Sequence, residues 1–302
     1  MIREVRCEGQ RTSRPGHSPE RYNPCLRGVG GITKLATRIM LGLLYSHRGE
    51  EAATVNPLDA THRQQPASRT AEACATCGSR VAGLCHRLDA AVLDDFAADS
   101  QRFHLPAKSN VFREGDPATR AYSLVEGVVK LSRLLADGKQ QVVGFRFAGD
   151  VLGYGAGKTY PFDAELLTEG HLCRIERSRL DALMRLYPQL ERRLLQLCLT
   201  ELSNTQDQLV TIGRRSAESR VASFLLGLVE AYRLRGPLPE DLPMPMTRSD
   251  IGDFLGLTLE TVSRSFAAFK RQKLIAEPGQ HKLRILNADA LHRLTDGEPA
   301  DV

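Results

Sequence analysis

The spacing of turns between residues 110 and 175 constrains the fold more than any other feature of the chain. Glycine-containing turns recur there about every ten residues and separate short segments rich in β-branched and aromatic residues, namely 110–116, 121–127, 128–132, 137–143 and 147–153. Evenly spaced segments of this kind predict an all-β barrel or roll. Leu167–Ile175 is expected to be its last strand, and Cys173 lies on that strand.

Beyond Arg179 the apolar spacing becomes helical, and no proline or glycine lies between Gln189 and Ile212. The helix carries a leucine stripe made of Leu186, Leu190, Leu194, Leu197, Leu202 and Leu209. A stripe of this length has more apolar surface than one compact roll can cover. We therefore expect it to pair with a second copy of itself, as in a coiled coil. Cys198 falls on the stripe and is interpreted as a small buried apolar residue.

Two helix-start signals follow the proline-rich linker at residues 237–245 and indicate a helix-turn-helix. Thr247 can cap a first helix, and Asp250 stands three residues later, where a capping box places an acid. Gly256 supplies a tight turn, and Thr258 caps the second helix. Residues 277–285 have a hairpin pattern, which favours a winged helix-turn-helix that binds double-stranded DNA.

The second helix of this pair separates its apolar and polar side chains. Its apolar side carries Val262, Phe266 and Phe269. Glu260, Ser263 and Arg264 cluster away from that side near the helix N-terminus, where a recognition helix presents side chains to the major groove. In a lone helix, an ordinary solvated face would explain the pattern better. The preceding cap–turn–cap arrangement favours base contacts, with Arg suited to guanine and Glu to cytosine.

Three cysteines lie within twelve residues, at Cys74, Cys77 and Cys85, and can turn onto one metal ion or cluster. Thiolates are soft ligands that favour zinc, Cu(I) or iron–sulfur clusters. His86 is the local candidate for a fourth ligand, but it directly follows Cys85, so we expect the fourth ligand to come from elsewhere. On spacing alone, structural zinc is favoured.

Composition narrows the class of protein. The 302 residues are 42% hydrophobic, enough for a sizeable core, and no apolar run is long enough to cross a bilayer. Residues 1–70 hold 11 Lys and Arg against 6 Asp and Glu, which accounts for the whole net charge of +5. We expect these residues to form an unstructured extension, with Met40 as an alternative start. The first thirty residues lack a signal peptide, which predicts a cytoplasmic protein.

These segments together resemble the Crp/Fnr superfamily of bacterial transcription regulators, in particular its FNR-type oxygen sensors. The similarity covers roughly residues 74–295, and its specific motifs are Cys74–Cys85, Ala148–Tyr154, Leu172–Glu176 and Leu257–Arg264. The last motif matches the family's Glu-x-x-Ser-Arg motif, with which the recognition helix contacts DNA bases. The resemblance therefore implies a homodimer that reads a TTGAT-like inverted repeat, works with RNA polymerase, and contacts DNA through Thr258, Glu260, Ser263 and Arg264.

The resemblance also implies the cofactor. The family's distal cysteine falls on Cys173, so Cys74, Cys77, Cys85 and Cys173 would hold a 4Fe–4S cluster, with zinc as the alternative. The gap between the second and third cysteines is longer than in other branches of the family. The roll resembles a cyclic-nucleotide-binding domain, yet residues 153–164 lack the Arg-Ser pair that faces the nucleotide phosphate, so cyclic nucleotide is not the expected ligand.

The expected fold class is α+β: a cyclic-nucleotide-binding-like β-roll, a long dimerisation helix and a winged helix-turn-helix. We expect an extension at residues 1–70, a cysteine-containing sensor domain at 71–185, the dimerisation helix at 186–213 and the DNA-binding domain at 214–302. An iron–sulfur electron carrier or redox enzyme is the alternative class. It would leave the helix-turn-helix unexplained, and no catalytic triad, flavin motif or paired-carboxylate site is recognisable, so we predict that the chain is not an enzyme.

Overall fold

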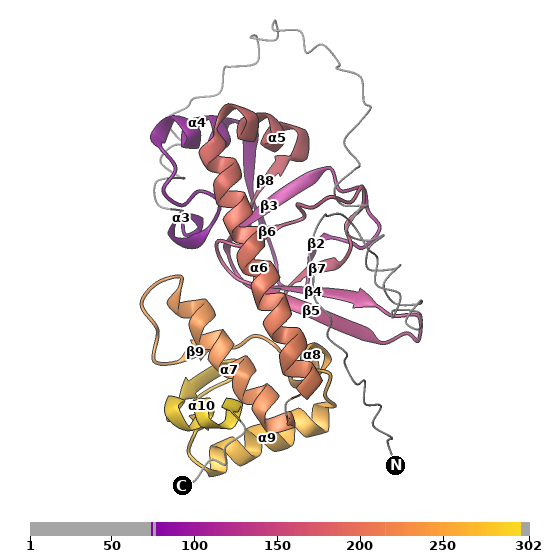
Figure 1. Cartoon of the computed structure of the whole chain (residues 1–302), viewed down its shortest axis with the longest axis vertical. Coiled ribbons are helices and arrows are strands. Elements are labelled where there is room, and N and C mark those ends of the chain that lie inside the picture. The colour runs from indigo at the N-terminus through magenta and orange to yellow at the C-terminus, as the bar shows by residue number, and fades with distance from the viewer. Residues whose placement is uncertain (1–73, 75–76, 215, 297–302) are drawn as a thin grey trace, which may run out of the picture. The chain divides into compact units, whose positions relative to one another are not determined.

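The computed structural model describes Cys74 and residues 77–214 and 216–296 (Figure 1). All of them belong to one compact unit, Gln65–Val302. The expected extension at residues 1–70 and the alternative start at Met40 lie outside the described residues. None of the helices in the described part is long and apolar enough to span a membrane.

Two four-stranded antiparallel sheets build the β-roll within the described residues. One sheet has the order β1-β8-β3-β6 and the other β2-β7-β4-β5. Their strands are β1 (Ser100–Leu105), β2 (Asn110–Phe112), β3 (Arg120–Glu126), β4 (Val129–Leu134), β5 (Gln140–Arg146), β6 (Val151–Leu152), β7 (Asp163–Leu166) and β8 (Gly170–Glu176). The turn spacing therefore predicted the roll correctly, and Cys173 does lie on its last strand, β8.

Aromatic and aliphatic side chains fill the interior of the roll. The rings of Phe112 and Tyr160 stack with their centroids 4.0 Å apart, and Tyr122 lies 5.7 Å from Phe112. Leu124 and Leu166 are fully buried beside them. This packing follows from the alternation of apolar residues along the short strands, which turns every second side chain inward.

Two helices precede the roll in the chain, α3 (Ser79–Ala82) and α4 (Ala90–Asp99), and two follow it, α5 (Arg177–Leu186) and α6 (Pro188–Arg214). Figure 1 shows α6 as one long helix. It ends at Arg214, one residue beyond the expected dimerisation helix at 186–213, and the next helix begins at Ala217.

The leucine stripe of α6 divides between two faces, which the sequence pattern did not predict. Leu190 and Leu194 are buried against the roll's own helices, together with Leu84 and Cys85. Four other leucines of α6 are more than half exposed, Leu195, Leu199, Leu202 and Leu209, and so is Val210. Cys198 lies next to Leu199 and is exposed in the single chain, so its burial stays a prediction that depends on the expected pairing of two copies.

The C-terminal part contains the predicted winged helix-turn-helix. Its elements are α7 (Ala217–Arg233), β9 (Leu242–Pro243), α8 (Arg248–Leu255), α9 (Leu259–Arg271), β10 (Ile275–Ala276), β11 (Lys282–Ile285) and α10 (Ala288–Asp296). The wing is a small sheet with the order β10-β11-β9. Strand β9 lies inside the proline-rich stretch that the sequence presented as a linker only, and Pro243 occupies the sheet edge, where its missing N–H is tolerated.

A single hydrophobic cluster joins the roll to the helix-turn-helix. Val142, Phe145 and Phe147 of the roll belong to the same buried cluster as Phe224 of α7 and Ile251 of α8. Phe145 meets the ring of Phe224 edge-on, with centroids 6.0 Å apart. The α+β fold class is therefore as predicted, and its two halves share a core.

Candidate metal centre and DNA interface

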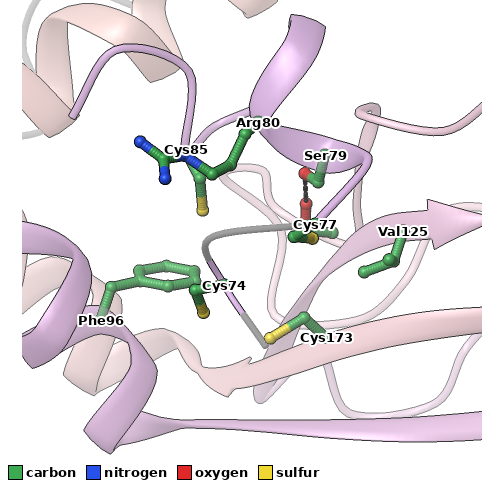
Figure 2. A pocket seen from close by; sticks show the side chains of 9 residues that line it. Cys74, Cys77, Ser79, Arg80, Cys85, Phe96, Val125 and Cys173 are labelled. Carbon is green, nitrogen blue, oxygen red and sulfur yellow. Dashed lines mark hydrogen bonds between the residues drawn. The ribbon is translucent and has the colours of Figure 1, made fainter. Parts of the chain in front are cut away.

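Four cysteines line one pocket beside the roll (Figure 2). They are Cys74, Cys77, Cys85 and Cys173. Phe96 and Val125 supply apolar walls, whereas Ser79, Ser123 and Arg80 are its polar lining residues. The structure thus brings together all four cysteines that the sequence singled out, although Cys173 is far from the other three in the chain.

Local hydrogen bonds shape the loop that carries the first three thiols. The Cys77 amide donates to the Cys74 carbonyl at 3.3 Å, and the Arg80 amide donates to the Cys77 carbonyl at 3.0 Å. These turns lead into the short helix α3. Leu84 and Cys85 are buried in the same cluster as α4 and α6, which anchors the far end of the loop.

Strand β8 holds Cys173 in the middle of its sheet. Cys173 pairs in register with Arg102 of β1 on one side and Ser123 of β3 on the other. Both neighbouring strands are antiparallel to β8, so the backbone of this ligand candidate is fixed by two ladders. The cysteine loop is thereby placed against a rigid sheet.

Burial and mutual repulsion disfavour free thiolates in this pocket. Burial, followed by the nearby Cys173, Cys74 and Cys77, raises the pKa of Cys85 to about 12. Burial also raises the pKa of Cys74 and of Cys173 above the usual thiol value. A bound cationic metal centre would reverse this preference because it stabilises the deprotonated sulfur, and binding would release protons.

His86, the other local candidate for a ligand, points its Nδ1 elsewhere. That nitrogen donates a hydrogen bond to the Arg80 carbonyl at 2.9 Å, and His86 is not among the residues that line the pocket. The bond ties the residue after Cys85 back to helix α3. His86 therefore supports the shape of the loop.

Sequence reasoning missed two groups around the pocket. Ser79 and Ser123 share a buried hydrogen bond of 2.7 Å between their hydroxyls, although they lie 44 residues apart. Arg193 of α6 donates to the carbonyl of Gly83 at 3.0 Å and also to that of Ala82. Neither pair has a local sequence signature, because both depend on contacts between distant segments.

The donor set fits a soft metal centre. Four thiols converge from a loop and a strand, which is the ligation found in both structural zinc sites and iron–sulfur clusters. Within the described residues, no three His, Cys, Asp or Glu side chains are grouped closely enough to hold a single metal ion. The arrangement therefore offers four sulfur ligands around a pocket and no preformed one-ion cage.

The helix-turn-helix has the caps that the sequence predicted. The Thr247 side chain accepts from the Asp250 amide and the Asp250 carboxylate accepts from the Thr247 amide, which completes a capping box. Gly256 ends α8 in the left-handed conformation, with φ of 64°. Thr258 caps α9, and its hydroxyl accepts from the Thr261 amide at 3.2 Å.

The predicted base-reading side chains lie on the outer face of α9. Thr258, Glu260 and Arg264 are exposed and Ser263 is partly exposed. Hydrogen bonding to its own backbone amide, then to Thr258, holds the pKa of the Glu260 carboxyl below its usual range, with a smaller contribution from Arg264. At neutral pH this face therefore presents a carboxylate and a guanidinium within the first turns of the helix.

The inner face of α9 is anchored in the domain core. Val262 is fully buried, and Phe266 and Phe269 are nearly so. The Arg248 guanidinium lies 3.5 Å from the centroid of the Phe266 ring and also pairs with Glu277 of the wing. This packing fixes the rotation of α9, so the same polar side chains always face outward.

Comparison with known proteins identifies the family. Residues 102–187 match the cyclic nucleotide-binding domain, and residues 219–294 match the Crp-like helix-turn-helix domain. The nitrogen fixation regulation protein FixK of Bradyrhizobium diazoefficiens is 39% identical over 203 residues, which cover 67% of this chain and 86% of that protein. The chain belongs to the Crp/Fnr family. The resemblance to the Crp/Fnr family stated from the sequence motifs is thereby confirmed.

Other Crp/Fnr members support the assignment. The fumarate and nitrate reduction regulatory protein of Salmonella typhi is 33% identical over 187 residues, which cover 61% of this chain and 74% of that protein. The solved structure of FixK2 from Bradyrhizobium japonicum shares 32% identity, with a TM-score of 0.60, and covers 67% of this chain and 99% of that one. Crp/Fnr proteins bind DNA and act as dimers, so this chain is a DNA-binding transcription regulator and not an enzyme.

Proposed function

We propose that this Crp/Fnr protein is an oxygen-responsive regulator that binds DNA as a homodimer when Cys74, Cys77, Cys85 and Cys173 hold a 4Fe–4S cluster. The convergence of these four cysteines on one pocket is the observation that carries the proposal. When bound, such a cluster supplies a centre whose survival depends on the absence of oxygen. The relatives named above include a fumarate and nitrate reduction regulator, which is consistent with control by respiration.

Four thiols suit zinc and iron–sulfur clusters alike, and the similarity to a fumarate and nitrate reduction regulator favours the cluster. A tetrahedral zinc ion needs its sulfur ligands within about 4 Å of one another, because each Zn–S bond is about 2.3 Å long. A larger iron–sulfide cage suits four cysteines spread around a pocket, and the apolar Phe96 and Val125 would limit the access of water to it.

Helix α6 supplies the proposed dimer seam. Its exposed apolar residues Leu195, Leu199, Leu202 and Leu209 are separated by four, three and seven positions, the spacing of a heptad repeat. Pairing of two such seams would place two copies of α9 about one turn of DNA apart. Thr258, Glu260, Ser263 and Arg264 would then read the two halves of a TTGAT-like inverted repeat, and RNA polymerase is the proposed partner at the promoter. Because it acts on the chromosome of a bacterium, we place it in the cytoplasm.

Two features of the roll weigh against a cyclic nucleotide as the signal. The stacked rings of Phe112 and Tyr160 occupy its interior. Arg177 donates hydrogen bonds to the carbonyls of Gly153, Gly155 and Gly157, so this cation is already engaged by the loop where a nucleotide phosphate would be held. We therefore assign the sensing role to the cysteine pocket.

Anaerobic purification of the full chain, followed by iron and sulfide analysis, tests the proposal. About four irons per chain are expected, with about as much sulfide, together with binding to a TTGAT–ATCAA palindrome that is lost in air. Cys173→Ala should lose the iron, whereas Cys198→Ala should keep it because Cys198 is exposed on α6, outside the pocket. Zinc in place of iron, or DNA binding that is indifferent to air, would instead support a Crp-type regulator with a structural metal or another signal.

A further inference from the structure

Arg193 connects helix α6 directly to the loop between the second and third cysteines. Its Nε donates to the Gly83 carbonyl at 3.0 Å, and its Nη2 donates to the Ala82 carbonyl. These carbonyls lie at the C-terminal end of α3, where backbone oxygens lack partners within the helix. A guanidinium matches such a site because it offers several donors and a positive charge to the negative end of the helix.

The loop between Cys77 and Cys85, to which Arg193 donates its hydrogen bonds, is tightly packed. Gly83 is packed so closely that an added Cβ would lie 2.5 Å from the Ser79 carbonyl oxygen and 2.6 Å from the Gly149 carbonyl oxygen. On the other side, Leu84 is buried with Leu190 and Leu194 of α6. The segment from Ala82 to Cys85 is therefore clamped between the roll and the first turns of α6.

The same turns of α6 also begin the exposed seam. Leu194 is buried with Leu84 of the cysteine loop, whereas Leu195, the next residue, is exposed. At 3.6 residues per turn, Arg193 and Leu195 point about 160° apart, so Arg193 holds the inner side of the same turn whose outer side begins the seam. If the Ala82 and Gly83 carbonyls moved, the Arg193 side chain would transmit the movement to α6 and so change the orientation of the seam.

We propose that Arg193 is a positioning residue that couples the cysteine loop to the dimer seam of α6. When Cys77 and Cys85 bind the proposed cluster, the Ala82 and Gly83 carbonyls are fixed. Arg193 then holds the first turns of α6 in the orientation in which two copies of α6 pair. When these thiols are released, Arg193 loses its acceptors and the seam loses that support. This inference rests on the proposed function, because it requires a state in which the cysteines are held and one in which they are not.

Replacing Arg193 in the full chain separates coupling from simple loop support. The variant Arg193→Met keeps an unbranched apolar stem but removes every donor, and Arg193→Lys keeps the charge with a single donor group. Arg185→Met is the matched control, because Arg185 is an exposed arginine on the neighbouring helix α5. For each anaerobic protein, iron and sulfide per chain, the visible absorption and the dimer dissociation constant from sedimentation are measured before and after air.

In the wild type and in Arg185→Met, we expect iron-loaded protein whose dimer weakens in air. Arg193→Met should keep the wild-type iron content and absorption, but its dimer should already be weakened about tenfold without air, the size of one lost charge-assisted hydrogen bond. Air should then change its dimer constant little. Arg193→Lys should restore part of the response to air, which a role in packing alone would not predict.

Two results would overturn the inference and leave the proposed function standing. One is an iron-loaded Arg193→Met protein whose dimer responds to air as the wild type does. The other is loss of iron from both Arg193 variants, which would make Arg193 a support of the cysteine loop and not a link to the seam. Wild-type protein without iron would overturn the proposed function itself, and the inference with it.

Discussion

Lys130 Nζ lies 3.0 Å from Asp250 Oδ1 and joins strand β4 of the roll to the first turn of helix α8. Glu165 of β7 approaches the same ammonium group at 3.1 Å. The Lys130 side chain is only 9% exposed and that of Asp250 only 10%, so water screens this pair weakly. Asp250 also completes the capping box, which makes the pair a direct link between the sensor half and the DNA-reading half.

Replacing Lys130 by Met should destabilise the protein by about 3 kcal/mol, because removal of the lysine leaves the buried Asp250 carboxylate uncompensated. Urea unfolding of the anaerobic protein measures this cost. Lys139→Met is the matched control: Lys139 pairs with Asp137, but its side chain is 81% exposed, so a change within about 0.5 kcal/mol is expected. Equal costs for the two substitutions would contradict the buried-link interpretation.

Asp250 should also make stability depend on acid. Burial acts to raise its pKa, but hydrogen bonds from Thr247 and Lys130 outweigh burial and hold the pKa of the Asp250 carboxyl below its usual value. A carboxyl with a depressed folded pKa stabilises the protein above its unfolded pKa, and this contribution disappears as the pH falls through the folded pKa. The urea midpoint should therefore fall below about pH 4. Asp250→Asn, measured over the same pH range, should show a smaller fall; an identical profile would exclude Asp250 as the source.

The close packing of Gly83 predicts that a single methyl group will disturb the cysteine loop. Gly83→Ala places a Cβ against two backbone oxygens, so the loop must move, with an expected cost of about 1–3 kcal/mol and a lower iron content. Gly155→Ala is the control, because a Cβ at Gly155 meets nothing within 4 Å. Thermal unfolding and iron analysis of both variants provide the measurement. Full iron loading of Gly83→Ala would show that the loop tolerates the shift.

The outer face of α6 predicts a monomeric variant. Leu199 is 56% exposed in the single chain, so Leu199→Glu should leave each chain folded and able to hold iron while it places two like charges in the seam of the dimer. Sedimentation of the anaerobic protein should show monomers. Leu286→Glu, at a position 51% exposed near the wing, should remain dimeric. A dimeric Leu199→Glu protein would move the interface to another surface.

Arg264 should determine DNA sequence preference without supporting the fold. Its Nη2 donates a hydrogen bond to the Thr261 hydroxyl at 3.3 Å, and its side chain is exposed. Arg264→Ala is expected to weaken binding to the palindrome by about 1–3 kcal/mol and to relax discrimination at one base pair. Arg271→Ala, at an exposed position in the last turn of the same helix, is the control. Fluorescence anisotropy with matched and single-mismatch duplexes distinguishes lost specificity from a uniform loss of phosphate contact.

Local patterns predicted the elements of this protein better than the contacts between them. The capping box at Thr247 and the strand that carries Cys173 each follow from a few neighbouring residues. The link between Lys130 and Asp250 spans 120 residues, and that between Arg193 and Gly83 spans 110, so neither has a repeat or motif to reveal it. Nothing in the spacing of the leucines on α6 indicates which of them face the roll, because that depends on how the cysteine loop packs.

The shared core of the two halves limits how this regulator can be recombined with others. The ring of Phe145 in the roll lies 6.0 Å from that of Phe224 and 5.4 Å from that of Phe254, both in the reading half. A hybrid spliced between α6 and α7 would strip these aromatic partners from Phe145 and expose it. The β-roll and the helix-turn-helix therefore cannot be exchanged independently between regulators. A functional chimera would have to carry the β4–β5 hairpin together with the helix-turn-helix that packs against it.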